Sequence, residues 1–476
     1  MESAPQFVVE AIELFERDVA LRMPFRFGVV TLTAAPQAFV RARVRLADGT
    51  IGEGMAAELL APKWFDKNPR YSNEDNFDQL RAALRLARGL YLDGTSDTAF
   101  GHFARHYAAQ LERAAQQGLV PLVANYGPAL IDRAVLDALC RALQLPFHEA
   151  IRANRVGIAP GELCPDLAGF HWPAFLGALQ PAARIEARHT VGLVDPITSS
   201  DQTERVGDGL PETLEEVIAI YGHRWFKLKV AGDIDADLQR LTRIASVLDR
   251  IDGGYRASLD GNEQYDAIDG IAELWRRMNA EPKLARLCAS VAFIEQPIKR
   301  QAALARDVRA LSSLKPVIID ESDDSLDAFV RARELGYQGV SSKTCKGLYK
   351  SLINRARCAQ WNAAAGEPRW FMSAEDLTIQ AGLALQQDLA LVSLMGIEHV
   401  ERNGHHYVNG MAALGAGEQQ AFLDAHPDLY ERSHGAVRVR IRDGALSIGS
   451  LGGVGFASGA APDWASMRTM RTDRMP

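Results

Sequence analysis

Short apolar runs alternate with amphipathic segments over the second half of the chain, from residue 185 onward. The runs have the length of buried strands, and the segments between them repeat their apolar positions with the period of a helix. We expect strands near residues 187–194, 225–230, 256–260, 291–295, 316–320, 338–343, 369–373 and 394–400. We expect the intervening helices near residues 212–221, 235–249, 267–279, 301–312, 325–335, 347–364 and 376–389.

This alternation predicts an α/β fold in which residues 185–410 form a closed parallel (β/α)8-type TIM barrel. An open doubly wound sheet is the alternative architecture. That fold usually carries a Gly-x-Gly-x-x-Gly turn after its first strand, and no such turn follows any of the expected strands. We therefore favour the barrel.

The first 151 residues have a different pattern. Residues 7–53 are strand-like, and residues 39–46 alternate strictly between apolar and polar positions before the Asp48-Gly49 turn, which predicts an antiparallel meander. The period becomes helical over residues 73–151, so residues 1–151 are expected to form an α+β domain. Residues 23–28 and 55–65 are expected to be loops that touch a ligand.

Two further segments flank the expected barrel. Residues 152–184 contain four prolines and are expected to form an irregular connection or insertion. Residues 411–476 return to loops and short strands, and we expect them to pack back onto the N-terminal domain. The chain is thus divided into an N-terminal domain, a connection, a barrel and a C-terminal segment.

Composition narrows the functional classes. The chain has 476 residues and a net charge of -7, so it has no uniform basic field and nucleic acid is not expected as a partner. No apolar run approaches the roughly 20 residues that span a bilayer, and no basic segment followed by an apolar core begins the chain, so we expect a cytoplasmic protein without a membrane partner. The five cysteines are scattered and are expected to be reduced thiols.

Lys227 and Lys229 are separated by one residue within the apolar run 225–230. Because side chains alternate along a strand, both lysines project from the same face. Two buried ammonium groups are costly unless anions lie opposite them. The pair alone is also compatible with the wet face of an edge strand, so the rest of the chain must decide.

Isolated charged residues close successive expected strands: Lys229, Asp260, Glu295, Asp320 and Lys343. Each has an ordinary explanation by itself, such as a turn, a helix cap or a solvated lysine. Their recurrence on successive strands favours a shared role, because barrel enzymes place their active sites at the carboxyl ends of the strands.

Three of these residues, Asp260, Glu295 and Asp320, form an all-oxygen ligand set. Such a set suits a hard divalent cation, magnesium or manganese in its place, rather than zinc. A cation that binds a substrate carboxylate acidifies the neighbouring α-proton, because the resulting enediolate spreads its charge onto the bound oxygens. A lysine crowded by another ammonium and by the cation has a lowered pKa and acts as a base.

The motifs that carry this pattern are Phe-Lys-Leu-Lys at 226–229, Asp-Gly-Asn at 260–262, Phe-Ile-Glu-Gln-Pro at 293–297, Ile-Asp-Glu-Ser at 319–322, and the late Lys343. Together they resemble the enolase superfamily, specifically the muconate-lactonising-enzyme-like subgroup of the mandelate racemase/muconate lactonising enzyme family. Residues 24–28 and 48–54 resemble the capping domain of that family. The resemblance implies a barrel with an N-terminal α+β capping domain that the C-terminal segment completes.

The resemblance also implies roles for individual residues. Lys229 and Lys343 would be the acid/base pair, with Lys227 supporting Lys229 or the substrate carboxylate. Asp260, Glu295 and Asp320 would hold the magnesium ion. Further residues expected next to the metal ligands or the substrate are Asn262, Glu321, Ser373, Glu375 and Glu398, with Glu401 as the alternative to Glu398.

The choice of subgroup depends on residues in the later strands. Residues 370–375 contain no histidine, whereas mandelate-racemase-like members carry a histidine base on the seventh strand, so Lys343 on the sixth strand favours the two-lysine subgroup. Cys345-Lys346-Gly347 replaces the usual glycine pair, and the aspartates of dipeptide epimerases are absent from the eighth strand. His399, His405 and His406 are expected to be loop histidines bonded to water or backbone.

These observations predict an enzyme, an isomerase or a lyase, that abstracts a proton α to the carboxylate of a small molecule. Two opposed lysines suit a racemase, epimerase, cycloisomerase or syn-lyase. The alternatives are an acid-sugar dehydratase and a non-catalytic metal-binding barrel. We expect the protein to be a homo-oligomer.

Overall fold

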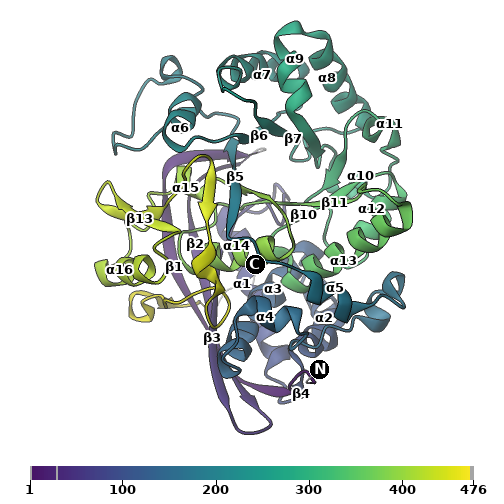
Figure 1. Cartoon of the computed structure of the whole chain (residues 1–476), viewed down its shortest axis with the longest axis vertical. Helices are drawn as coiled ribbons and strands as arrows, with labels where there is room; N and C mark the ends of the chain where they lie inside the picture. The colour runs from purple at the N-terminus through teal and green to yellow at the C-terminus, as the bar shows by residue number, and fades with distance from the viewer. Residues whose placement is uncertain (1–2, 28–29, 472–476) are drawn as a thin grey trace.

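The computed structural model describes residues 3–27 and 30–471 and has a mixed α/β fold (Figure 1). An antiparallel sheet with its own helices forms the N-terminal part. A curled parallel sheet surrounded by helices forms the larger part of the chain. Gly28, which belongs to one of the expected ligand loops, lies outside the described residues.

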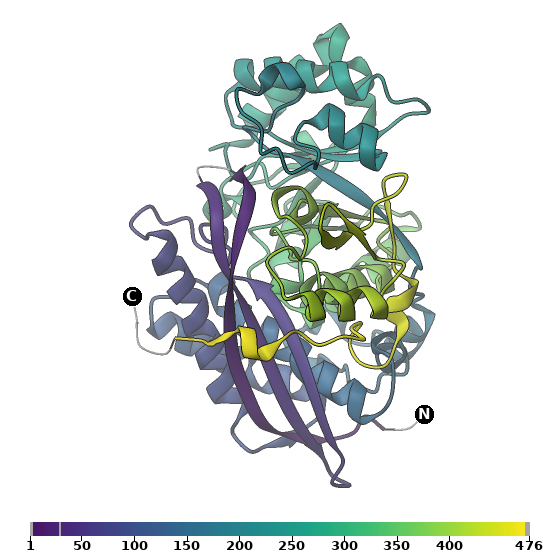
Figure 2. The same cartoon turned by 90° about the vertical axis from the view of Figure 1, so that its left-hand side faces the viewer.

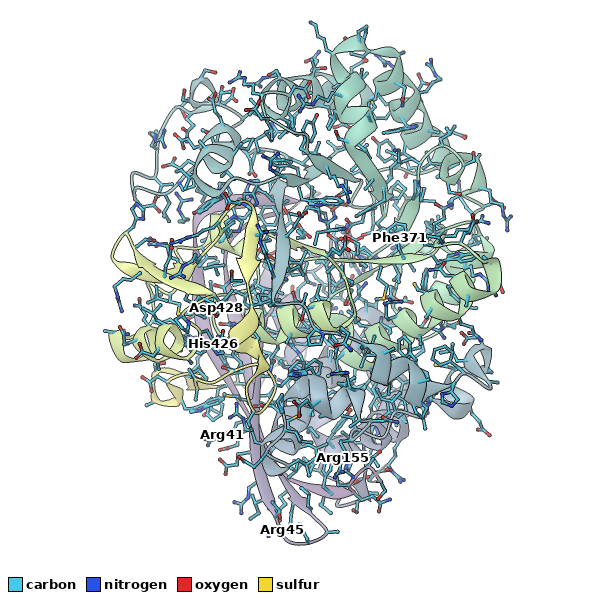
Figure 3. All side chains as sticks on the ribbon, in the orientation of Figure 1. Arg41, Arg45, Arg155, Phe371, His426 and Asp428 are labelled. Carbon is cyan, nitrogen blue, oxygen red and sulfur yellow. The ribbon has the colours of Figure 1, made fainter. Side chains whose placement is uncertain are left out.

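The N-terminal sheet consists of β1 (Phe7–Phe27), β2 (Val30–Leu46) and β3 (Ile51–Leu59), paired in chain order and antiparallel. Arg41 and Arg45, labelled in Figure 3, alternate with buried apolar residues of β2, and this alternation makes one face of the sheet wet. The predicted meander is confirmed. The expectation of loops at residues 23–27 and 55–59 is wrong, because these residues extend β1 and β3.

Four helices follow the sheet: α1 (Asn73–Tyr91), α2 (Ala99–Gln116), α3 (Pro121–Ala142) and α4 (Phe147–Arg152), with the short strand β4 (Ser96–Asp97) before α2. Helix α3 packs directly on β3. A Cβ atom on Gly54 would lie 2.1 Å from the backbone nitrogen of Ala138, so only glycine permits this approach.

The connection at residues 152–184 contains only short helices, namely α5 (Trp172–Ala178) and the 3-10 turns η1 (Gly161–Leu163) and η2 (Pro165–Leu167). It leads into the first strand of the parallel sheet. The irregular segment that the prolines predict is therefore observed.

The parallel sheet contains β5 (Arg184–Val191), β6 (Trp225–Lys229), β7 (Arg256–Asp260), β8 (Val291–Glu295), β9 (Val317–Ile319), β10 (Gly339–Ser342), β11 (Phe371–Ala374) and β12 (His399–Arg402). Their hydrogen-bonded order is β11-β10-β9-β8-β7-β6-β5-β12. The strands at the two ends of this order, β11 and β12, lie against each other, so the sheet curls round. All of the predicted strands are present, but the last begins at His399 rather than near residue 394.

The helices between these strands are α6 (Leu214–Tyr221), α7 (Ile234–Leu248), α8 (Ile268–Ala280), α9 (Ala285–Ser290), α10 (Arg300–Ala303), α11 (Arg309–Ser312), α12 (Ala328–Glu334), α13 (Leu348–Ala365) and α14 (Leu383–Leu394), with 3-10 turns η3 (Ser199–Asp201), η4 (Pro282–Leu284) and η5 (Thr344–Lys346). They cover the outside of the sheet (Figure 1). Two predicted helices differ: residues 301–312 form two short helices, and the helix expected from residue 376 begins at Leu383. The intervening residues instead form a loop at the end of β11.

The C-terminal part contains α15 (Gly404–Tyr407), α16 (Ala416–Ala425), β13 (Tyr430–Ser433), β14 (Ala436–Val439), β15 (Ala445–Ser447), η6 (Gly449–Gly452), η7 (Trp464–Ser466) and β16 (Arg468–Thr469). Strand β15 pairs with β5, and β16 pairs with β1. Figure 2 shows this last yellow segment crossing the N-terminal strands. The chain end thus links the parallel sheet to the N-terminal sheet.

Two further observations concern the chain as a whole. All five cysteines are buried and free of disulfides. Among the helices within residues 3–27 and 30–471, none combines the length and the apolar character needed to cross a bilayer.

Candidate active site

Charged side chains gather at the carboxyl ends of neighbouring parallel strands. Lys229, Asp260 and Glu295 are the last residues of β6, β7 and β8, and the strand register sets Lys229 beside Asp260 and Asp260 beside Glu295. Asp320 and Lys343 directly follow β9 and β10. The structure thus brings the five residues expected from the strand ends to one rim of the sheet.

Lys227 lies one layer deeper, in the middle of four carboxylates. Its Nζ atom is 2.9 Å from Asp260 Oδ2, 2.9 Å from Glu295 Oε2, 2.7 Å from Glu375 Oε2 and 3.0 Å from Glu401 Oε2. Burial disfavours its charged form, but the four carboxylates outweigh burial and hold the pKa of Lys227 well above its usual range. The permanent positive charge of Lys227 therefore holds the carboxylates together.

The two lysines at the rim are each paired with a different carboxylate. Lys229 Nζ donates a 2.5 Å hydrogen bond to Asp260 Oδ2. Lys343 Nζ forms an ion pair with Asp320. Lys229 and Lys343 line the same pocket. Two proton-carrying groups from different strands thus face one space.

The wall of this pocket combines polar groups of the parallel sheet with apolar groups from the N-terminal part. Phe25, Leu32, Ala61 and Trp64 form the apolar side. Lys343 Nζ lies 4.4 Å from the centroid of the Trp64 ring, a cation–π contact. Phe25, Ala61 and Trp64, which belong to the two segments expected to touch a ligand, line this pocket.

The sequence predicts a lowered lysine pKa, but the charged groups around Lys343 raise the pKa of this residue. Burial disfavours the ammonium form of Lys343, but Asp320 outweighs burial, so the pKa of Lys343 lies above its usual range. Burial also opposes ionisation of Asp320, yet Lys343 and Lys346 hold its pKa well below the usual value. Without a cation beside it, Lys343 is therefore an acid rather than a base.

The carboxylates nevertheless fit a hard divalent cation. Burial raises the pKa of Glu295 well above the usual range, and repulsion from Asp260 and Glu375 raises it further. This repulsion is the energy that an added positive charge would relieve. Two buried oxygens beside this group, Asn262 Oδ1 and Glu321 Oε2, have no hydrogen-bond partner among the described residues. The oxygen-only set of Asp260, Glu295 and Asp320 suits magnesium.

The sequence profile described as "Enolase C-terminal domain-like" matches residues 209–457, which is more than half of the chain. The matched region runs from before β6 through β12 and thus contains every residue of the rim. The chain belongs to the enolase superfamily. The resemblance to the enolase superfamily is confirmed.

Solved structures of superfamily members share the fold at low sequence identity. A muconate lactonizing enzyme from Pseudomonas fluorescens, complexed with muconolactone, has a TM-score of 0.59 and 19% identity, with 96% of this chain and 98% of that chain covered. The L-Ala-D/L-Glu epimerase from Bacillus subtilis gives 0.56 and 16%, covering 95% and 99%. An enolase from Bradyrhizobium, complexed with magnesium and mandelic acid, gives 0.59 and 14%, covering 97% of each chain. A comparison with proteins of curated function finds no match.

Four further predicted residues of this superfamily member lie close to the rim. Asn262 lines the pocket, and its Nδ2 atom donates a 3.3 Å hydrogen bond to Glu321. Ser373 Oγ donates a 2.5 Å hydrogen bond to Glu375, which also contacts Lys227. These side chains surround the carboxylates that we expect to hold a metal.

Glu398 is a wrong prediction. It is exposed, precedes β12, and lines a separate surface pocket with Trp225, Phe293 and Phe371 at the amino end of the strands. Phe371, labelled in Figure 3, marks this end. Glu401, the alternative, lies at the opposite end of β12 and is buried in the site. The error arises because β12 begins at His399, later than the apolar run suggests.

Sequence reasoning missed Arg188. Its guanidinium donates hydrogen bonds to Ser258 Oγ at 2.9 Å and to Ser373 Oγ at 3.1 Å, and it forms a buried ion pair with Glu375. The same strand face carries Thr190, which donates a 2.5 Å hydrogen bond to Glu401. The alternation Arg188, His189, Thr190 in the first strand was the available signal, because it places two polar side chains on the inner face.

Lys346 and Asp376 were also missed. Lys346 Nζ lies 3.4 Å from Asp320 Oδ1 and donates a 2.7 Å hydrogen bond to the carbonyl of Ser341, so it adds positive charge beside Asp320. Asp376 lines the pocket and accepts a 2.9 Å hydrogen bond from the backbone of Asn403. In the sequence, Lys346 stands out only as part of the replaced glycine pair, and Asp376 is expected at the start of a helix.

Proposed function

We propose that this protein abstracts a proton α to the carboxylate of a small-molecule substrate, with Lys229 and Lys343 as opposed acid and base. The observation that carries the proposal is that both lysines line one pocket while their partners, Asp260 and Asp320, stand at strand ends on either side of Glu295. Membership in the enolase superfamily supports the same general reaction.

In this proposal one lysine accepts a proton and the other donates one. One neutral amine accepts the α-proton, and the electron pair of the broken C–H bond moves onto the substrate carboxylate. The other ammonium returns a proton to the α-carbon from the opposite side or protonates a leaving group. This division suits a racemase, epimerase, cycloisomerase or syn-lyase.

Lys227 has a different task in this proposal. Because four carboxylates surround it, it keeps its proton and fixes Asp260, Glu295, Glu375 and Glu401 in place. Asp260, Glu295 and Asp320 would hold a magnesium ion. When bound, the ion would supply positive charge that stabilises the substrate carboxylate as it gains electron density and that favours the neutral form of the nearby lysines.

The proposed architecture is a closed (β/α)8 barrel over residues 185–410. An α+β capping domain over residues 1–151 would be joined to it by residues 152–184 and completed by residues 411–476. The contact between β11 and β12 supports closure, and the pairing of β16 with β1 supports the completed cap. Phe25 and Trp64 extend the cap to the pocket, so the cap would choose the part of the substrate away from the carboxylate.

The test is proton exchange in heavy water. A panel of carboxylic acids with an α-proton is incubated with the protein and magnesium, and ¹H NMR follows loss of the α-proton signal. Wild type is expected to exchange at least one member of the panel, and Lys229→Ala and Lys343→Ala are each expected to reduce exchange by about 10² to 10⁴-fold. Lys299→Ala is the matched control, because the Lys299 side chain is 55% exposed on the surface.

The outcomes separate the alternatives. Exchange that survives in only one lysine variant assigns the face that each lysine serves. A 2-keto product indicates acid-sugar dehydration. Wild-type exchange rates in both lysine variants would contradict the two-lysine mechanism, and tight binding without exchange across the panel would indicate a non-catalytic barrel.

A further inference from the structure

Four histidines gather beside β5, on the face opposite to the carboxylates. Arg188 and Thr190 point into the candidate active site, so His189 between them points to the other face of the sheet. The His189 ring centroid lies 5.2 Å from that of His223, 5.6 Å from that of His405 and 5.0 Å from that of His406. These rings come from β5, from the residues before β6, and from α15.

Three of these side chains direct nitrogen atoms toward a common point. One ring nitrogen from each of His189, His223 and His405 lies within 4.8 Å of the corresponding nitrogen of the other two. Among the described residues, this is the set of three histidine, cysteine, aspartate or glutamate side chains that meets this distance. Zinc–nitrogen bonds of about 2.0–2.1 Å hold ligand nitrogens roughly 3.3 Å apart, so modest rotations of the rings would close the set around an ion.

The tautomer of His223 is suited to metal binding. His223 Nδ1 lies 2.9 Å from the carbonyl oxygen of Ala187, and because a carbonyl only accepts, Nδ1 carries the hydrogen. The lone pair is therefore on Nε2, which is buried without a hydrogen-bond partner among the described residues. Metal-ligating histidines commonly donate their other ring nitrogen to a backbone carbonyl in this way.

Unpartnered nitrogens are the second sign of a site. His189 Nδ1 and both ring nitrogens of His405 are also buried without a partner in the described part of the chain. His189 is only 2% exposed, so bulk water does not reach its side chain. A buried polar atom without a partner costs about 1–3 kcal/mol. Packing among the rings does not satisfy these lone pairs, but coordination of a cation does. The expectation of a loop position is wrong for His405, which lies in α15.

We propose that His189, His223 and His405 bind a divalent transition-metal cation of the zinc class. Three imidazole nitrogens suit zinc, copper or nickel and do not suit magnesium, which prefers oxygen ligands. His405 is half-buried and lines a pocket together with Tyr221 and Arg402, so this ligand lies next to a cavity. Burial lowers the pKa of all three histidines, so they are neutral and ready to coordinate.

The position of the site suggests a structural effect. The ion would join β5, the start of β6, and α15, which directly follows β12. Because β12, β5 and β6 are neighbours in the sheet, the three ligands lie beside three adjacent strands. Asn403, which immediately precedes α15, lines the candidate active-site pocket. Binding is therefore expected to stabilise the fold, and it uses no residue of the proposed reaction.

The experiment is a zinc titration of the full chain without an affinity tag. The protein is stripped with a chelator and kept in excess magnesium, and zinc is added in competition with a dye of known zinc affinity. Wild type is expected to bind one zinc per chain and to gain thermal stability, and cobalt is expected to give the visible absorption bands of a tetrahedral site. His405→Ala and His223→Gln are expected to lower zinc affinity by at least about 100-fold. Loss of a residue that only supports a metal ligand lowers metal affinity by about 10 to 100-fold.

Two variants serve as controls. His434→Asn removes an exposed histidine whose φ of 45° asparagine also tolerates, and its zinc affinity is expected to equal that of wild type. Asp260→Asn is expected to keep zinc binding, because it alters only the carboxylate rim. Absence of zinc binding in wild type, unchanged affinity in His405→Ala, or loss of zinc in Asp260→Asn would each overturn the proposal. None of these results bears on the lysine mechanism, which proton exchange tests separately.

Discussion

Lys227 Nζ on β6 lies 2.7 Å from Glu375 Oε2 at the end of β11, although four strands separate β6 from β11 in the hydrogen-bonded order of the sheet. The pair meets across the interior of the curled sheet. Lys227 is 1% exposed and contacts three further carboxylates at the same point. One ammonium group therefore contacts carboxylates that come from several strands.

The first prediction concerns this central charge. Lys227→Met should lower the free energy of unfolding at pH 7 by about 3–5 kcal/mol, because it leaves buried carboxylates without their partner. Urea unfolding measures the loss, which should shrink in acid as the carboxylates become protonated. Lys299→Met, which breaks an exposed pair with Asp266, should change stability by less than about 1 kcal/mol. Equal losses in the two variants would show that Lys227 has no special role.

The second prediction compares two glutamates at opposite ends of β12. Glu401→Gln should reduce the rate of α-proton exchange by about tenfold or more, because it weakens the contact with Lys227 and the hydrogen bond from Thr190. Glu398→Gln should leave the rate within about twofold, since Glu398 is exposed at the other end. A loss of exchange in Glu398→Gln would mean that the site extends to the amino end of the strands.

The third prediction concerns metal removal. EDTA should abolish proton exchange, and magnesium should restore it. Magnesium should also raise the midpoint of thermal unfolding, since a ligand at about 100 times its Kd adds about 2.7 kcal/mol to the free energy of unfolding. Glu295→Gln should remove most of this stabilisation. Full exchange in EDTA would contradict a role for Asp260, Glu295 and Asp320 as metal ligands.

The fourth prediction is a pH dependence far from the rim. Burial raises the pKa of Asp132 to about 8, and the 2.6 Å hydrogen bond from Tyr91 only partly opposes this. The unfolded chain ionises Asp132 near pH 4, so the folded state retains a proton that the unfolded state releases. The contribution of this group to the free energy of unfolding therefore falls as pH rises from about 4 to 8, by up to about 1.4 kcal/mol per unit.

Asp132→Asn removes this dependence while keeping an acceptor for Tyr91. The variant should gain stability relative to wild type between pH 5 and pH 8, as measured by urea unfolding at a series of pH values. Asp252→Asn, at an exposed position, is the control. A difference between Asp132→Asn and wild type that stays constant with pH would contradict the assigned protonation.

Much of the rim could be predicted because its residues are tied to local pattern. Lys229, Asp260 and Glu295 each end an apolar run, and an apolar run of that length is buried on both faces of a parallel sheet. Once the strands are parallel, their last residues must meet at one edge. No contact between distant residues has to be known to reach this conclusion.

The sequence by itself therefore determined the order of the strands and the set of charges at their carboxyl ends. Only the tertiary structure decided that Arg188 binds Glu375, that Glu401 rather than Glu398 faces Lys227, and that His189, His223 and His405 come together. The physical reason is that these relationships depend on where a strand begins and on how far the sheet curls. Both are set by packing between residues far apart in the chain, which no local period encodes.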